Sequence, residues 1–214
     1  MAANASGMPA LRYLALGDSY TVGEGVDPAG AWPMRLAAAL RAEGVPLADP
    51  AVIATTGWTT DELDAAIDAA APAADFDLAS LLIGVNNQYR GRSAEEYDAQ
   101  FSALLGRAIG FAAGDPGRTF VLSIPDWGVT PFAARSGRDP ARIARELDAF
   151  NAIAARRCRE REVAFVDITP ASRAHGAQPG MLAGDGLHPS AAMYGKWAEL
   201  ALPVVRRLLQ RGQK

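Results

Sequence analysis

The sequence predicts an α/β fold built on a parallel β-sheet. Short runs of strand-forming residues alternate with longer helical patterns along the whole chain, as in successive βαβ units. Most of these runs are continuously apolar, which is typical of strands that are buried on both faces of a sheet. The five predicted strands are residues 11–17, 51–54, 78–84, 119–125 and 163–168.

The helices between these strands are predicted from capping residues and apolar stripes. Their predicted N-caps are Thr59, Ser93, Asp139 and Ser190, the first two with a glutamate at capping-box spacing. Pro203 is expected to kink or end the last helix. Cys158 falls on the apolar stripe of the helix that Asp139 begins, so we expect a packed thiol rather than a reactive one.

No repeat, low-complexity tract or linker divides the 214 residues, and this length suits one core. We therefore expect a single domain over residues 1–214, with 1–9 flexible. The N-terminus has neither the basic segment nor the apolar run of a signal peptide. No apolar stretch approaches the ~20 residues of a bilayer span. These features predict a cytoplasmic protein without stable membrane insertion, and the sequence leaves its oligomeric state open.

The charge and the cysteine content narrow the classes of function. The chain has 21 basic and 24 acidic residues and a net charge of -3. It lacks the basic excess of proteins that bind a phosphate backbone, so we expect no nucleic acid partner. One cysteine and two histidines make multi-cysteine metal sites impossible and other metal sites improbable, so we expect neither a metal nor a cofactor.

Polar and small residues follow the predicted strands, at the point where each strand ends. Ligands of open parallel sheets bind beyond the carboxyl ends of the strands, so these residues are expected to converge at one edge. They are the segments 17–20, 55–58, 84–87 and 126–128, together with 185–188 beyond a glycine-containing loop.

Ser19 is the candidate nucleophile of this edge, and it needs a base because a serine hydroxyl does not ionise near neutral pH. His188 is the better of the two histidines, since Asp185 lies three residues before it and can orient its ring. His175 has no acidic neighbour in sequence and is interpreted as a surface residue. An Asp-x-x-His spacing taken alone is more typical of a solvated turn.

Three groups on separate loops are candidate donors to a developing oxyanion: the main-chain amides of Ser19 and Gly57 and the side chain of Asn86. Each has a structural alternative. Gly57 can be present only because the chain needs a positive φ angle after the strand, and Asn86 with Asn87 can form a turn. The conjunction of these groups with the serine and the histidine favours a catalytic site.

These residues resemble the SGNH or GDSL hydrolases. Gly17-Asp18-Ser19-Tyr20 resembles the GDS nucleophile motif, Gly57 the lone glycine, Gly84-Val85-Asn86-Asn87 the GxND motif, and Asp185-x-x-His188 the DxxH motif. The four motifs stand in the family's order and span most of the chain. Two positions depart from the pattern: Tyr20 replaces a leucine and Asn87 replaces an aspartate, which puts any supporting role of that aspartate in doubt.

The resemblance implies a three-layer, flavodoxin-like fold around a five-stranded parallel sheet. It also implies serine esterase chemistry, with Ser19, Asp185 and His188 as the triad and Ser19, Gly57 and Asn86 as the oxyanion hole. The expected reaction is hydrolysis of a small-molecule ester through an acyl-enzyme. Acetylated sugars, lysophospholipids and thioesters are all compatible with the resemblance.

Aromatic residues just beyond the strand ends are candidates for the substrate pocket. Trp58, Tyr89 and Trp127 are expected to bind substrate, and Phe132 is a weaker candidate. Because the loops after the strands are short and no lid is evident, we expect a shallow site that favours acetyl or other short acyl groups.

Two other classes of function stay open from the residues. A metal-dependent phosphoesterase would use Asp18, Asp126, Asp185 and His188, and it would lose activity on chelation. A noncatalytic, flavodoxin-like binding module would leave Ser19 unlabelled by an organophosphonate.

Overall fold

A five-stranded parallel sheet forms the centre of the computed structural model, which describes residues 10–211. The strands are β1 (Tyr13–Asp18), β2 (Ala51–Thr55), β3 (Leu78–Leu82), β4 (Thr119–Leu122) and β5 (Ala164–Val166). Their order is β2-β1-β3-β4-β5, the order of flavodoxin-like folds. The predicted fold class is therefore confirmed. The flexibility expected for residues 1–9 lies outside the described residues, and the single-domain extent stays a prediction.

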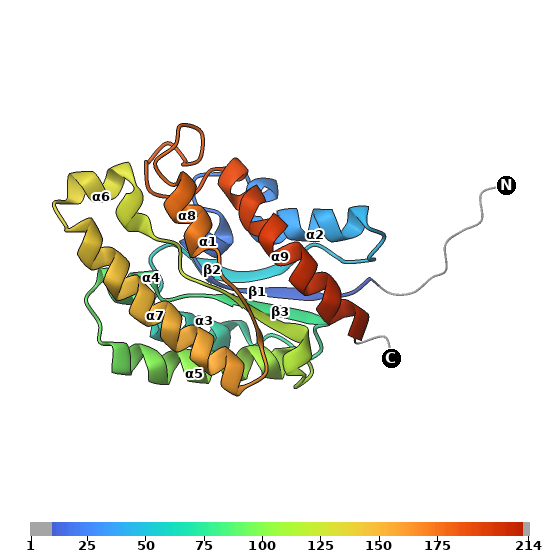
Figure 1. The fold of residues 1–214 in the computed structure, drawn as a ribbon. Helices are drawn as coiled ribbons and strands as arrows, with labels where there is room; N and C mark the ends of the chain where they lie inside the picture. The colour runs from blue at the N-terminus through green and yellow to red at the C-terminus, as the bar shows by residue number, and fades with distance from the viewer. Residues whose placement is uncertain (1–9, 212–214) are drawn as a thin grey trace.

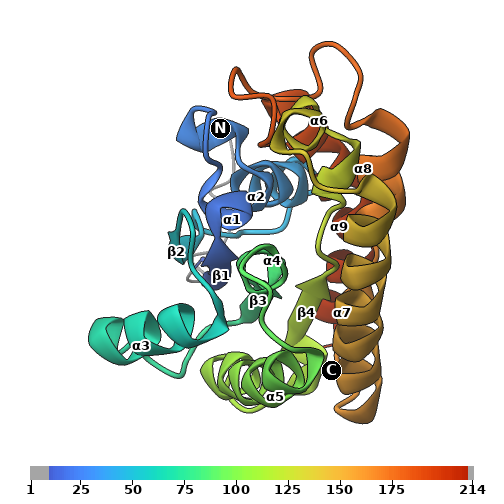
Figure 2. The same cartoon turned by 90° about the vertical axis from the view of Figure 1, so that its left-hand side faces the viewer.

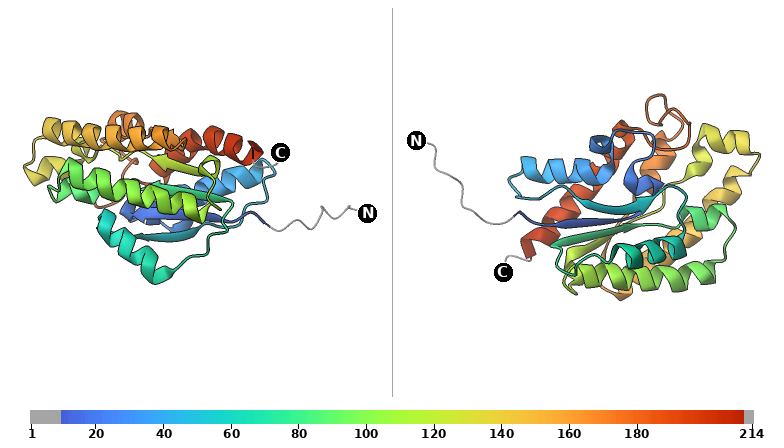
Figure 3. Two further views of the ribbon diagram at one scale, coloured as in Figure 1. Left: turned by 90° about the horizontal axis from the view of Figure 1, so that it is seen from below. Right: turned by 180° about the vertical axis from the view of Figure 1, so that it is seen from behind.

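Helices cover both faces of the sheet. On one face α2 (Trp32–Ala42) packs against α9 (Ala191–Arg211), with α8 (Thr169–His175) beside α9. The other face carries α3 (Thr60–Ala70), α5 (Ala94–Phe111) and α7 (Pro140–Glu160), and the rear view separates α2 from α3 and α5 (Figures 1 and 3). The shorter elements are α1 (Ser19–Val22), α4 (Val85–Tyr89), α6 (Pro131–Ser136), η1 (Pro28–Gly30), η2 (Pro116–Arg118) and η3 (Trp127–Val129).

The strands β1, β3 and β4 are buried along their whole length, as their apolar sequences predict. The strand β2 differs, because it lies at the edge of the sheet and Val52 is 40% exposed. An apolar run of this length does not distinguish a central strand from an edge strand. Only the order of the strands, which depends on the crossovers, decides it.

The predicted capping residues begin the helices. The Glu62 carboxylate accepts from the Thr59 N–H at 2.8 Å, and Ser93 and Asp139 accept from amides in the first turns of α5 and α7. Pro203 lies inside α9 and does not end it. The sequence analysis did not predict α2. Its N-cap residue is Ala31, whose side chain cannot accept a capping hydrogen bond, so the capping signal used for the other helices is missing.

The core fills the space between the sheet and both helical layers. Cys158 is completely buried on α7, as expected, and burial raises the pKa of its thiol to about 12. A thiol of this kind is protonated near neutral pH and unreactive. Within residues 10–211, no helix is both long enough and apolar enough to cross a membrane.

Candidate active site

The short helix α1 presents Ser19 at the carboxyl end of β1, next to the turns that follow β2 and β3 (Figure 2). Asp18 precedes it as the N-cap residue, and its buried carboxylate accepts from the Tyr20 N–H at 3.0 Å. The main-chain N–H of a residue at the start of a helix has no partner within that helix. The Ser19 amide is therefore suited to donate to a bound oxyanion.

Ser19, His188 and Asp185 form a continuous chain of hydrogen bonds across 169 residues of sequence. The His188 Nε2 atom lies 3.0 Å from the Ser19 Oγ, and its Nδ1 atom lies 2.5 Å from an Asp185 carboxylate oxygen. Because an ionised carboxylate only accepts, Nδ1 carries the proton and Nε2 is free to take the serine proton. The geometry is that of a nucleophile, a base and an orienting acid.

The Asp185 carboxylate is held in its ionised form. Partial burial acts to raise its pKa, but hydrogen bonds from the His188 ring and from the Leu187 and His188 amides outweigh burial, so the pKa of Asp185 lies below its usual value. The tight turn 185–188 supplies these amides. Asp185 therefore stays charged near neutral pH and can stabilise a protonated His188.

Gly57 and Asn86 stand beside Ser19 in the same cleft. Gly57 has a φ of 88°, a conformation that glycine adopts readily, and among the described residues its N–H donates no hydrogen bond. The Asn86 side-chain amide donates to the Trp58 carbonyl at 2.9 Å, which fixes its orientation and leaves a second N–H. The structure thus brings together the three predicted oxyanion donors.

Gly84 positions Asn86 by allowing β3 to turn sharply into α4. Its φ is 126°, and a Cβ atom there would come within 2.5 Å of the Tyr97 ring and 2.9 Å of Ile124. Any side chain would push α4 away from the sheet. These contacts explain why a glycine stands first in the Gly84-Val85-Asn86-Asn87 segment.

The cleft in front of Ser19 has a volume of about 190 Å³. Tyr89 and Trp127, two of the predicted substrate-binding residues, line it together with Phe132. The three rings contact one another, with centroids 5.4–6.5 Å apart. The Trp127 Nε1 donates to Gln88 at 2.9 Å, which holds the indole in place. One wall of the cleft is therefore a rigid aromatic cluster.

The third predicted substrate-binding residue, Trp58, is not among the residues that line this cleft. Its half-buried side chain packs against the hydrophobic core, and its carbonyl accepts from the Asn86 side chain. Its role in substrate binding stays a prediction. Four further lining residues, Tyr20, Thr56, Val85 and Leu187, fall within the segments expected at this edge, but the sequence assigned them no role in the pocket. Each adjoins a predicted site residue in sequence, which is the signal by which they could have been found.

The two departures from the family pattern have structural roles. The Tyr20 ring packs edge-on against the His188 ring, with centroids 5.7 Å apart, and also against Trp197. Asn87 is buried, and its amide accepts from the Thr60 N–H at 3.1 Å and donates to the Thr60 hydroxyl at 2.6 Å. Asn87 therefore joins α4 to the first turn of α3, and among residues 10–211 its side chain bonds to Thr60 rather than to the triad.

The other acidic and histidine candidates lie in local structure. Asp126 caps η3 and pairs with Arg173 at 2.9 Å, and Asp18 caps α1. His175 contacts Gln178 at the end of α8. Over residues 10–211, no group of three or more histidine, cysteine or acidic side chains is placed to share a metal ion.

A family model for GDSL-like lipases and acylhydrolases matches residues 15–196, a range that includes the whole site. The chain belongs to this family. The resemblance stated from the four motifs is thereby confirmed, and this GDSL-family protein is a serine ester hydrolase. No curated protein matches the chain.

Solved structures share the fold of this GDSL-family chain at low sequence identity. The structure of TesA has a TM-score of 0.70 at 21% identity and covers 92% of this chain and 99% of its own. The acetylxylan esterase Axe2 from Geobacillus stearothermophilus has a TM-score of 0.66 at 20% identity, covering 93% and 94%. The psychrotrophic esterase EstA from Pseudoalteromonas sp. has a TM-score of 0.68 at 16% identity, covering 93% and 98%.

Replacing Asp18 by asparagine should flatten the pH dependence of stability. Burial raises the pKa of Asp18 to about 7, partly offset by the hydrogen bond from the Tyr20 N–H. Because the folded protein then holds a proton that the unfolded chain has released, Asp18 favours folding at low pH, and this contribution is lost as pH rises through about 7. The free energy of unfolding of the wild type should decrease from about pH 5 to pH 8. In Asp18→Asn this decrease should be smaller by about 1–4 kcal/mol.

Urea unfolding at several pH values measures this difference. Asp27→Asn is the matched control, because Asp27 is exposed and its side chain caps no turn. The same pH slope in wild type and Asp18→Asn would show that the buried carboxyl does not titrate in this range.

Proposed function

We propose that this chain hydrolyses carboxylic esters with short acyl groups through an acyl-enzyme on Ser19. The observation that carries the proposal is the hydrogen-bonded chain of Ser19, His188 and Asp185 at the mouth of a small cleft. Ser19, Gly57 and Asn86 are the proposed oxyanion hole. Tyr89 and Trp127 are the proposed substrate-binding residues, together with Phe132, the weaker candidate from the sequence, which also lines the cleft.

In the proposed first step, the Ser19 Oγ attacks the ester carbonyl carbon while His188 Nε2 takes its proton. The carbonyl oxygen becomes an oxyanion, to which the amides of Ser19 and Gly57 and the free Asn86 N–H donate. The C–O bond to the alcohol then breaks, and His188 returns the proton to the leaving oxygen.

The second step repeats this chemistry with water. His188 takes a proton from water, whose oxygen attacks the acyl carbon, and the acid leaves as the Ser19 oxygen is reprotonated. The charged Asp185 stabilises the imidazolium that forms in both steps. The esterase EstA, which shares the fold, is inhibited by monoethylphosphonate. Because phosphonates react with nucleophilic serines, this inhibition supports a nucleophilic role for Ser19.

The preference for short acyl groups rests on the size and rigidity of the cleft. Its volume of about 190 Å³ is below the roughly 300–1,000 Å³ of sites that enclose drug-sized ligands. The rings of Tyr89, Trp127 and Phe132 pack against one another, with Trp127 edge-on to the other two, and leave little room for rearrangement. The acetylxylan esterase among the structural relatives also supports a small acyl group.

Hydrolysis of p-nitrophenyl esters over a range of acyl lengths tests this proposal. We expect kcat/KM to be highest for acetate or butyrate and to be unaffected by a metal chelator. Incubation with a fluorophosphonate should add one adduct, located on Ser19 by mass spectrometry. Maximal activity with decanoate or longer esters would contradict the short-acyl proposal, and an unlabelled Ser19 would contradict the acyl-enzyme. The cytoplasmic location stays a prediction from the sequence.

A further inference from the structure

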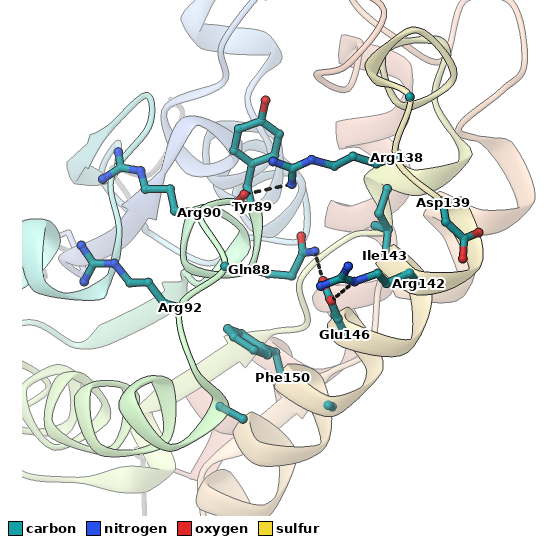
Figure 4. Close-up of a pocket in the computed structure, with 14 residues that line it drawn as sticks. Gln88, Tyr89, Arg90, Arg92, Arg138, Asp139, Arg142, Ile143, Glu146 and Phe150 are labelled. Carbon is teal, nitrogen blue, oxygen red and sulfur yellow. Dashed lines mark hydrogen bonds and ion pairs between the residues drawn. The ribbon is translucent and has the colours of Figure 1, made fainter.

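A second cavity adjoins the catalytic cleft and is larger than it. Its volume is about 730 Å³, and it lies between α4 with its following loop on one side and the α6–α7 loop with the first half of α7 on the other (Figure 4). Tyr89 lines both cavities and is 38% exposed. Tyr89 is the one residue that the two linings share, so the two cavities meet at its side chain.

Arginines dominate the charge of this larger cavity, and they differ in whether a carboxylate neutralises them. Three pair with carboxylates: Arg90 with Glu62, Arg92 with Asp61, and Arg142 with Glu146, at 2.7–3.1 Å. The fourth is Arg138, and no carboxylate of the described residues lies within ion-pair distance of it. Its charge is therefore free to bind another anion.

Arg138 lines the larger cavity and contacts two aromatic residues that line the catalytic cleft. Its Nη1 donates to the Tyr89 carbonyl at 2.9 Å, and its guanidinium carbon lies 4.2 Å from the centre of the Tyr89 ring and 5.7 Å from that of Trp127. Figure 4 shows the side chain reaching across to Tyr89, whereas Arg90 and Arg92 extend away from it. The rings contact the face of the guanidinium and the carbonyl takes one N–H, so further N–H groups stay free.

The acidic residues nearest to Arg138 already have other partners. Glu146 accepts from Arg142 and from Gln88, both at 2.7 Å. These hydrogen bonds, with a smaller contribution from the charge of Arg138, hold the pKa of Glu146 below its usual value. Asp139 lies 3.9 Å from Arg145. No internal carboxylate therefore occupies the position that a substrate anion would take beside Arg138.

We propose that Arg138 binds an oxyanion, a carboxylate or a phosphate, on the alcohol part of the ester. This inference rests on the proposed function, since it places the acyl group in the cleft next to Ser19. A planar guanidinium held by two rings is preoriented for such a group and loses little entropy on binding it. Arg138 is then a specificity-determining residue. It makes alcohols that carry a carboxylate or a phosphate the preferred leaving groups.

Three acetate esters test the proposal: 4-acetoxybenzoate, 4-acetoxyphenyl phosphate and the neutral methyl 4-acetoxybenzoate. The measured quantity is the ratio of kcat/KM for each anion to kcat/KM for the neutral ester, which cancels general effects of a substitution. Arg138→Gln should lower this ratio about tenfold, the loss expected for one partly exposed, charge-assisted hydrogen bond. Arg138→Lys should lower it less, because it keeps the charge but not the planar donor set.

Arg159→Gln is the matched control. Arg159 is exposed near the end of α7 and lines neither cavity. The substitution therefore removes one positive charge, as Arg138→Gln does, and leaves both cavities unchanged. Its ratio should equal that of wild type. A ratio in Arg138→Gln within twofold of wild type for both anions would overturn the proposal, and the anion with the larger fall identifies the preferred group.

Binding to Ser19→Ala separates this proposal from the proposed function. Calorimetry gives the Kd of 4-acetoxybenzoate and of its methyl ester without turnover. Adding Arg138→Gln to Ser19→Ala should weaken binding of the anion about tenfold more than binding of the neutral ester. This result would support the anion site even in a chain that hydrolyses none of the esters. Equal effects on the two ligands would contradict it.

Discussion

Ser19→Ala should abolish ester hydrolysis, lowering kcat by about 10⁴-fold or more. The Ser19 Oγ is 3.0 Å from the only nitrogen of His188 that can accept its proton, and the opposite nitrogen is engaged by Asp185. The loss of the hydroxyl removes the nucleophile and leaves the binding cleft and the oxyanion donors in place. Activity on p-nitrophenyl acetate before and after the substitution measures the effect.

The substitution should not disturb the fold. Ser19 is nearly buried, but its hydroxyl bonds only to His188 among the described residues, and α1 is capped by Asp18 rather than by Ser19. The melting temperature should therefore change little. Ser102→Ala, on α5 and outside the cleft, is the control for a serine elsewhere in the fold and should keep full activity. More than a few per cent of wild-type activity in Ser19→Ala would remove Ser19 from the role of nucleophile.

The sequence predicts the candidate site well because its chemistry lies on strand ends. In a parallel sheet these ends meet at one edge whatever the details of packing, so Ser19, Gly57 and Asn86 come together once β1, β2 and β3 are adjacent. The pair of Asp185 and His188 is local, since the two residues are three positions apart in one turn. The contact between His188 and Ser19 depends instead on where the loop after α8 lies in the tertiary fold.

The orientation of side chains away from the strand ends could not be predicted. Trp58 follows Gly57 directly, yet its ring packs against the core while its carbonyl holds Asn86. Arg138 lies in the loop between α6 and α7, outside any motif, and its contacts with Tyr89, 49 residues away, and with Trp127 arise only from the tertiary fold. Such contacts depend on how helices pack on the sheet, and periodicity contains no information on them.

Asn86→Ala should lower kcat by about 10²–10³ with a smaller change in KM. The side-chain amide has two N–H groups, of which one is fixed on the Trp58 carbonyl and the other is the proposed donor to the oxyanion. The bond to Trp58 holds the amide in place before substrate arrives, so no energy is spent on orienting it during reaction. The amides of Ser19 and Gly57 remain, which is why we expect a large residual rate compared with Ser19→Ala.

A structural role of Asn86 must be separated from this electrostatic one, because truncation also leaves the Trp58 carbonyl without its donor. Asn86→Asp keeps the size but cannot donate and adds a negative charge beside the developing oxyanion, so kcat should fall at least as far as in Asn86→Ala. The melting temperatures of both variants, with kcat and KM measured separately, distinguish the two roles. A fall in kcat of less than about fivefold in a stably folded Asn86→Ala would mean that the two main-chain amides suffice to hold the oxyanion.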